Sequence, residues 1–201
     1  MRSLWMACVL FVGVSLVSDA AAQATGIPSF NAPYRAFSRS EIGLVLTFPN
    51  GGGTAFEGAY RMSHGNFDLG FRGGIFTPGG NADSRLLIGA EARERVVTHT
   101  EDFPLDGALI LGVGGQFASG SSFAVIPVGL SLGRRVPKDS KISIVPYVQP
   151  TGFLIAGNGT SDFVFSLGLG ADFRLTPRFD ARISAGLGDL DGVSLSAVWV
   201  H

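Results

Sequence analysis

Residues 161–188 alternate between large apolar side chains and small or polar ones, and this pattern constrains the fold more than any other feature of the chain. Every second residue is apolar on both sides of a turn at Thr176-Pro177. A strict period of two is typical of extended strands, because successive side chains leave opposite faces of the backbone. The apolar positions are Phe163, Phe165, Leu167, Leu169, Ala171, Phe173 and Leu175 before the turn, and Phe179, Ala181, Ile183, Ala185 and Leu187 after it.

The two faces of this predicted hairpin differ in an unusual way. One is bulky and apolar, whereas the other carries glycine, serine and charge, as at Gly168, Gly170, Asp172 and Arg174. Glycine weakens a solvated strand and packs nothing, but it suits a crowded, curved interior. A barrel with lipid outside and a polar lumen produces this pattern about ten residues at a time. The soluble alternative is a secreted lipocalin-like barrel, whose larger apolar groups point inward around an apolar ligand.

The overall composition also favours a barrel in lipid. The chain has 201 residues, 29 of them glycine, and only 15% are charged, while its mean hydropathy is +0.33. No run of about eighteen uncharged apolar residues follows the N-terminal stretch, so no membrane helix is expected. These values leave either a large buried core or a β-barrel in lipid. The net charge of −1 gives no electrostatic basis for binding nucleic acid.

Residues 1–24 have the layout of a cleaved secretory signal peptide. Its parts are Arg2 as the positive start, Leu4 to Val17 as the apolar stretch, and Ala20-Ala21-Ala22 or Ala22-Gln23-Ala24 as the cleavage site. The only cysteine, Cys8, lies in this segment, so we expect no disulfide and no thiol chemistry in the mature chain. Residues 25–38 have no clear period and are predicted to form a periplasmic leader, tucked against the barrel or into it. Residues 39–201 are predicted to form the barrel.

Ten alternating segments are predicted, an even number, as single-chain bacterial barrels require. They span residues 39–48, 56–62, 67–75, 86–93, 109–117, 124–133, 142–149, 162–176, 179–187 and 193–199. Eight strands are the alternative, if the second or the seventh segment is not independent. The seventh contains Pro146 and Pro150, which cannot donate ladder hydrogen bonds. We therefore expect either a bulge there or a strand that extends beyond its neighbours.

The signal peptide, the glycine-rich alternating hairpins and the amphipathic last strand together resemble the small outer-membrane β-barrel proteins of Gram-negative bacteria, the opacity-type or OmpA-like barrels. The resemblance covers nearly all of the mature chain and rests on pattern. It implies a closed up-and-down barrel in outer-membrane lipid, inserted by the barrel-assembly machinery. Members usually end in Phe or Trp. Here Val193, Leu195, Ala197 and Trp199 keep the alternation, and His201 replaces the terminal aromatic residue.

Charged residues on the predicted inward face form the most informative constellation. Six strands each carry an acid and a base two or four residues apart on the same side. The pairs are Arg39 with Glu41, Glu57 with Arg61, Asp68 with Arg72, Glu91 with Arg93, Asp172 with Arg174, and Asp180 with Arg182. An arginine facing lipid near the midplane would cost roughly 2–4 kcal/mol, whereas in a lumen these charges can form a network.

Two interpretations of these charges remain open. They form either a structural ion-pair plug that fills a narrow barrel, or a charged constriction that lines a small solute pore. Barrel size favours the plug, because eight strands leave room only for side chains, whereas water-filled channels need around sixteen.

Other kinds of function find little support in the sequence. The mature chain has three histidines, His64, His99 and His201, and none forms a Ser-His-acid set. We therefore predict no catalytic residues, no metal site and no cofactor. The outward connections 49–53, 77–84, 118–122, 156–161 and 188–192 are short, which argues against a receptor site, and no protein partner is identifiable. The longest connection, 96–107, is expected to face the periplasm; if the strands before it are one fewer or one more, it faces outward and a binding role gains support.

Overall fold

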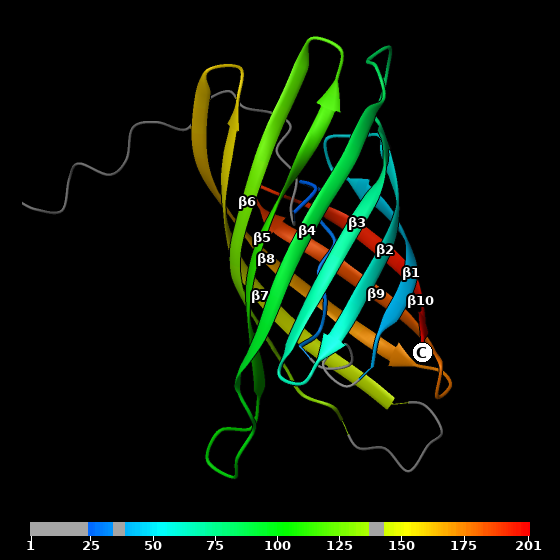
Figure 1. Ribbon diagram of the computed structural model, residues 1–201, viewed down its shortest axis with the longest axis vertical. Helices are drawn as coiled ribbons and strands as arrows, with labels where there is room; N and C mark the ends of the chain where they lie inside the picture. Colours follow the sequence, from blue (N-terminus) through cyan, green and yellow to red (C-terminus); the bar gives the residue numbers. More distant parts are fainter. Residues whose placement is uncertain (1–23, 34–38, 137–142) are drawn as a thin grey trace, which may run out of the picture.

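The computed structural model describes residues 24–33, 39–136 and 143–201. Ten strands close into a barrel (Figure 1), and no helix in the described part of the chain is long and apolar enough to cross a membrane. The strands are β1 (Glu41–Pro49), β2 (Thr54–His64), β3 (Phe67–Thr77), β4 (Arg85–Val97), β5 (Asp106–Ala118), β6 (Ser121–Gly133), β7 (Ser143–Gly157), β8 (Thr160–Arg174), β9 (Phe179–Gly188) and β10 (Gly192–Val200). The predicted signal peptide falls almost wholly outside the described residues, as do residues 34–38 of the predicted leader.

The barrel has the simplest up-and-down topology. Each strand pairs antiparallel with the next one in sequence, and β1 closes the ring by pairing with β10. The prediction of a closed antiparallel barrel with ten strands is confirmed. We call the end at which β1 begins and β10 finishes the terminus end, and the opposite one the far end. The connection between β4 and β5, residues 98–105, lies at the terminus end, where this hairpin projects beyond the other strands (Figure 1).

The seventh strand accommodates its prolines without a bulge. Pairing between β6 and β7 stops after Gly129↔Thr151 and resumes at Leu132↔Val148 in the same register, so no extra residue is inserted. The gap lies at Pro150, whose nitrogen cannot donate. The expected bulge is absent, and the strand is longer than only one of its neighbours: β7 has 15 residues, β6 has 13 and β8 has 15.

The hairpin between β7 and β8 shows how local sequence sets the register. Its two-residue turn is Asn158-Gly159, with φ of 51° and 82°. Asn-Gly tolerates positive φ at both positions, and such turns match the right-handed twist of the flanking strands. The turn therefore aligns the two longest strands, so that the apolar face predicted for β8 lies on the outside of the barrel.

Candidate functional site: a filled, charged lumen

The outer surface of the barrel is apolar on every strand. Each strand has at least one large apolar side chain that is 43% exposed or more. One such residue per strand, in order, is Leu44, Phe56, Phe71, Ile88, Val113, Val128, Leu154, Phe165, Ile183 and Leu195. The lipocalin-like alternative required these groups to point inward, and they do not. An outward apolar band around a closed sheet defines a membrane β-barrel.

The lumen face carries a continuous network of buried ion pairs. Arg61 on β2 contacts Asp68 and Glu91 directly, and its Nε lies 3.8 Å from Glu41 Oε1. Arg93 on β4 also binds Asp68, with 3.0 Å between Nη2 and Oδ2. The Arg61 guanidinium is therefore paired with three carboxylates on three different strands. Buried charges are tolerated when they are paired with opposite charges, and each of these three carboxylates is paired with a guanidinium.

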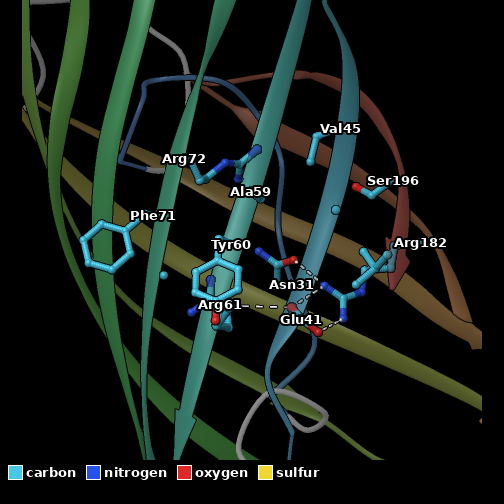
Figure 2. Close-up of a pocket in the computed structure, with 13 residues that line it drawn as sticks. Asn31, Glu41, Val45, Ala59, Tyr60, Arg61, Phe71, Arg72, Arg182 and Ser196 are labelled. Atoms are coloured by element: carbon cyan, nitrogen blue, oxygen red, sulfur yellow. Dashed lines mark hydrogen bonds and ion pairs between the residues drawn. The ribbon is translucent and has the colours of Figure 1, made fainter. Parts of the chain in front are cut away.

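Arg182 on β9 is a second centre of the same network. Its Nη2 lies 2.7 Å from Glu41 Oε2, and its Nε lies 3.1 Å from Asp172 Oδ2. Glu41 therefore joins the two centres, as the dashed lines in Figure 2 show. A separate bridge of 2.8 Å connects Arg72 Nη2 and Glu57 Oε2.

Ten of the twelve charged residues predicted to face the lumen are buried there: Glu41, Glu57, Arg61, Asp68, Arg72, Glu91, Arg93, Asp172, Asp180 and Arg182. Arg39 is not among them. It is exposed, precedes the first residue of β1, and donates to the Pro177 carbonyl at 3.4 Å. Alternation along the first strand predicted an inward position for Arg39, but Arg39 lies before that strand begins, where the alternation does not apply. Arg174 is half-buried at the terminus end of β8.

One predicted pair, Asp180 with Arg182, is present, with 4.0 Å between the charged groups. The other bridges of the network join different strands and not the partners predicted along one strand. The reason is geometric. Residues two apart on a strand are separated by about 6.6 Å, whereas residues opposite each other on neighbouring strands have Cβ atoms about 4.5–5.5 Å apart. A short acid therefore reaches across the sheet more readily than along it.

The lumen also contains a segment of the chain itself. Residues 24–33, which we call the plug, lie inside the barrel (Figure 1), and all but Asn31 are buried. The described part of the predicted leader, residues 25–33, therefore lies inside the barrel, which is one of its two expected places. The aperiodic sequence of this segment gave no indication of its partners.

Polar side chains of six strands hold the plug. From the plug, Thr25 Oγ1 donates to Glu57 at 2.8 Å, Phe30 N to Ser184 at 3.2 Å and Asn31 N to Gln149 at 3.3 Å. The plug's carbonyl groups accept from Gln116 (3.3 Å, at Gly26), Tyr147 (2.8 Å, at Phe30), Ser131 (2.8 Å, at Asn31) and Arg93 (3.0 Å, at Ala32). Satisfied backbone groups are what allow an irregular segment to lie inside a barrel in the membrane.

Two apolar contacts also hold the plug in place, and we call the barrel residues that contact it the plug seat. Ile27 packs into a cluster of inward side chains made of Ala55, Phe76 and Leu87. Phe30 belongs to a larger one, with Ala32, Val125, Val145, Tyr147, Phe153 and Leu190. Leu190 comes from the β9–β10 connection and is 1% exposed, so this far-end connection folds inward over the plug.

Glycines on the inward face make room for the plug. A Cβ placed on Gly168 would overlap the Phe30 ring, and one on Gly89 would lie 2.8 Å from Ala24 Cβ. Gly58 faces the outside of the barrel, where the nearest atom to such a Cβ is 3.9 Å away. The glycine-rich lumen face is therefore shaped around a polypeptide segment.

We expect Gly168→Ala to displace Phe30 and lower the free energy of unfolding by about 1–3 kcal/mol, the usual cost of overpacking. Gly58→Ala is the matched control and should change it by less than about 0.5 kcal/mol. Urea unfolding of both variants in detergent measures the difference. Equal stabilities would contradict the assignment of Gly168 to the plug seat.

A small cavity lies beside the ion pairs at the plug. The cavity, of about 30 Å³, lies beside Asn31, Glu41, Arg61 and Arg182 (Figure 2). Since a water needs roughly 10–15 Å³ of such space, the cavity has room for about two waters and not for a solute.

The histidines lie apart from this network. His99 Nδ1 is 2.8 Å from Asp106 Oδ2 at the terminus end. The His201 ring stacks on Tyr60, with 6.0 Å between ring centroids. Among the described residues, no three His, Cys, Asp or Glu side chains are grouped as ligands for a metal ion.

No protein-family model and no curated protein matches the chain. Two of the solved structures that are similar to it in backbone arrangement are membrane β-barrels. A de novo designed transmembrane β-barrel matches with 13% identity and a TM-score of 0.39, over 81% of this chain and 95% of the other. The β domain of the Bordetella autotransporter Brka matches with 11% identity and a TM-score of 0.48, over 81% and 98%.

Proposed function

We propose that this chain is an outer-membrane protein of a Gram-negative bacterium, exported by a cleaved signal peptide, with a structural role and a closed lumen. The observation that carries the proposal is the plug. Residues 24–33 occupy the lumen, are bonded to six strands, and leave a cavity of about 30 Å³ beside the ion pairs. An open porin would instead need a continuous water-filled path.

The remaining parts of the proposal follow from the surfaces of the barrel. The partner of the outer face is lipid, because apolar side chains cover it on all ten strands. Insertion depends on the barrel-assembly machinery, and the terminus end faces the periplasm. We propose no enzymatic activity, because the buried carboxylates are bound to arginines and not presented to a substrate.

Two measurements on the exported protein test the proposal. We expect it in the outer-membrane fraction, with a gel mobility that changes between unheated and boiled samples in detergent. In a planar bilayer, the purified folded protein should produce no conductance steps. A soluble protein without the mobility shift would contradict membrane insertion, and regular conductance steps would favour the alternative, a small solute pore.

A further inference from the structure

Charged side chains of opposite sign occupy different parts of the rim at the terminus end. Four arginines lie over β6 to β9, two directly after β6 and two on either side of the β8–β9 turn. We call them the arginine arc: Arg134, Arg135, Arg174 and Arg178. The exposed acids of this end, Glu94, Glu101 and Asp102, lie on β4 and in the β4–β5 connection. The β4–β5 hairpin and the β8–β9 turn lie apart at this end (Figure 1).

The positive charge of the arc is open to solvent. Arg134, Arg135 and Arg178 are exposed, whereas Arg174 is half-buried and lies opposite the buried Asp180 in the β8–β9 register. Among the described residues, no exposed acidic side chain lies on this part of the rim. The far end differs in sign, because its exposed charged residues are Asp83, Asp162 and Asp189. One side of the terminus end therefore attracts anions.

Arg134 lies at the edge of the apolar outer face. The β6–β7 ladder continues beyond Gly133, since Arg134 N donates to the Pro146 carbonyl at 3.3 Å and Val136 N to the Ile144 carbonyl at 2.9 Å. The alternation of β6 therefore extends to Arg134, which lies on the outer face between Leu132 and Val136. An arginine on the lipid face is costly at the midplane and is tolerated near the interface. Arg134 thus marks the membrane boundary on β6.

Trp199 marks the same boundary beside Arg178. Its side chain is 51% exposed on the outer face of β10, opposite Phe179 of β9. The next residue, Val200, donates its N–H to the Arg178 carbonyl at 2.8 Å, which places Arg178 next to this aromatic pair. Tryptophan is enriched where the hydrocarbon core meets the headgroups. Both halves of the arc are therefore at headgroup level.

We propose that the arginine arc binds the headgroups of anionic phospholipids in the leaflet around the terminus end. This inference rests on the proposed membrane insertion. Guanidinium groups form paired hydrogen bonds with phosphate, and arginines near a membrane surface attract anionic lipids. Inorganic phosphate offers the same charge without acyl chains. The exposed apolar side chains beside the arc, Val136 and Leu175, favour a ligand that has both parts.

Trp199 can report on the lipid beside Arg178. The other tryptophan, Trp5, lies in the predicted signal peptide, so the mature chain has a single tryptophan. The exported barrel is reconstituted in vesicles of equal parts phosphatidylcholine and phosphatidylglycerol, with bromine near the headgroup end of the acyl chains of one lipid at a time. Bromine quenches tryptophan fluorescence on contact, so the two samples compare the lipids at Trp199. We expect phosphatidylglycerol to be preferred about fivefold, and less so at high salt.

Variants assign this preference to the arc. Arg178→Gln should reduce it to below about twofold. Arg95→Gln removes a positive charge at the same end, on β4, and should leave it unchanged. Trp199→Phe with Leu132→Trp moves the reporter to β6, where Arg134→Gln should have the corresponding effect. Inorganic phosphate should lower the preference no more than NaCl of the same ionic strength does.

Three outcomes would overturn the inference and leave the membrane barrel intact. They are equal quenching by the two brominated lipids, a preference that Arg178→Gln does not change, and a preference abolished by phosphate but not by NaCl, which would indicate a site for small anions. A folded barrel whose Trp199 is quenched by neither lipid would instead contradict the proposed membrane insertion as well.

Discussion

Replacing Arg61 with methionine is expected to destabilise the barrel by about 3–5 kcal/mol, the usual cost of removing one partner from a buried ion pair. Methionine keeps much of the volume and the apolar stem of arginine, so the main change is electrostatic. Glu91, Asp68 and Glu41 all contact the Arg61 guanidinium, and each of these acids is buried. Urea unfolding of the detergent-solubilised barrel, followed by gel mobility, measures the change.

Two further variants show whether this loss comes from unpaired carboxylates. Arg39→Gln changes an exposed arginine outside the lumen and should alter stability by less than about 0.5 kcal/mol. Adding Glu91→Gln to the Arg61→Met variant should restore part of the lost stability, because it removes one of the carboxylates left without a guanidinium partner. If the Arg61→Met barrel unfolds at the same urea concentration as the parent, the network does not stabilise the barrel.

Alternation along the strands predicts the closed barrel and its outward face, and it favours ten strands with eight as the alternative. Each strand in lipid must satisfy all of its backbone groups in the sheet and show apolar side chains on one side, so the local sequence carries this information residue by residue. Leu169, for example, was predicted to face outward from β8 and is 41% exposed. The same alternation predicted inward positions for Glu57 and Asp172, and both side chains are buried in the lumen.

The partners inside the lumen could not be read in this way. Arg61 and Glu91 meet across three strands, and their distance depends on the registers of two hairpins and on barrel closure. The alternation also did not predict the polarity of every inward residue, because the apolar side chains of Phe76, Leu87 and Phe153 point into the lumen. These apolar residues are covered by the plug, a segment whose own sequence is aperiodic.

A signal for the plug did exist in the lumen face. Gly89, Gly112 and Gly168 occupy inward positions where a Cβ would meet Ala24 or Phe30. A polypeptide segment inside the barrel accounts for these three glycines, whereas Gly70 and Gly170 make room for the Arg61 and Tyr147 side chains.

Deleting residues 25–33 is expected to convert a non-conducting barrel into a pore. A lumen that holds a ten-residue segment has, once emptied, enough room for water and ions. The walls that remain carry buried carboxylates and guanidiniums, so the emptied lumen should be polar enough to conduct ions. The measurement is planar-bilayer conductance, with the reversal potential in a KCl gradient giving the sign of the selectivity.

The deletion is informative only if the barrel still folds, so the mobility shift on boiling is checked first. A second variant keeps the chain length and weakens the seat: Ile27→Gly with Phe30→Gly removes the two apolar contacts of the plug. It should conduct intermittently, as the loosened plug leaves and re-enters, while Phe30→Leu, which keeps an apolar side chain there, should stay closed. A folded deletion variant that conducts no ions would show that the side chains close the lumen by themselves. In that case the ion pairs, and not residues 24–33, are the barrier.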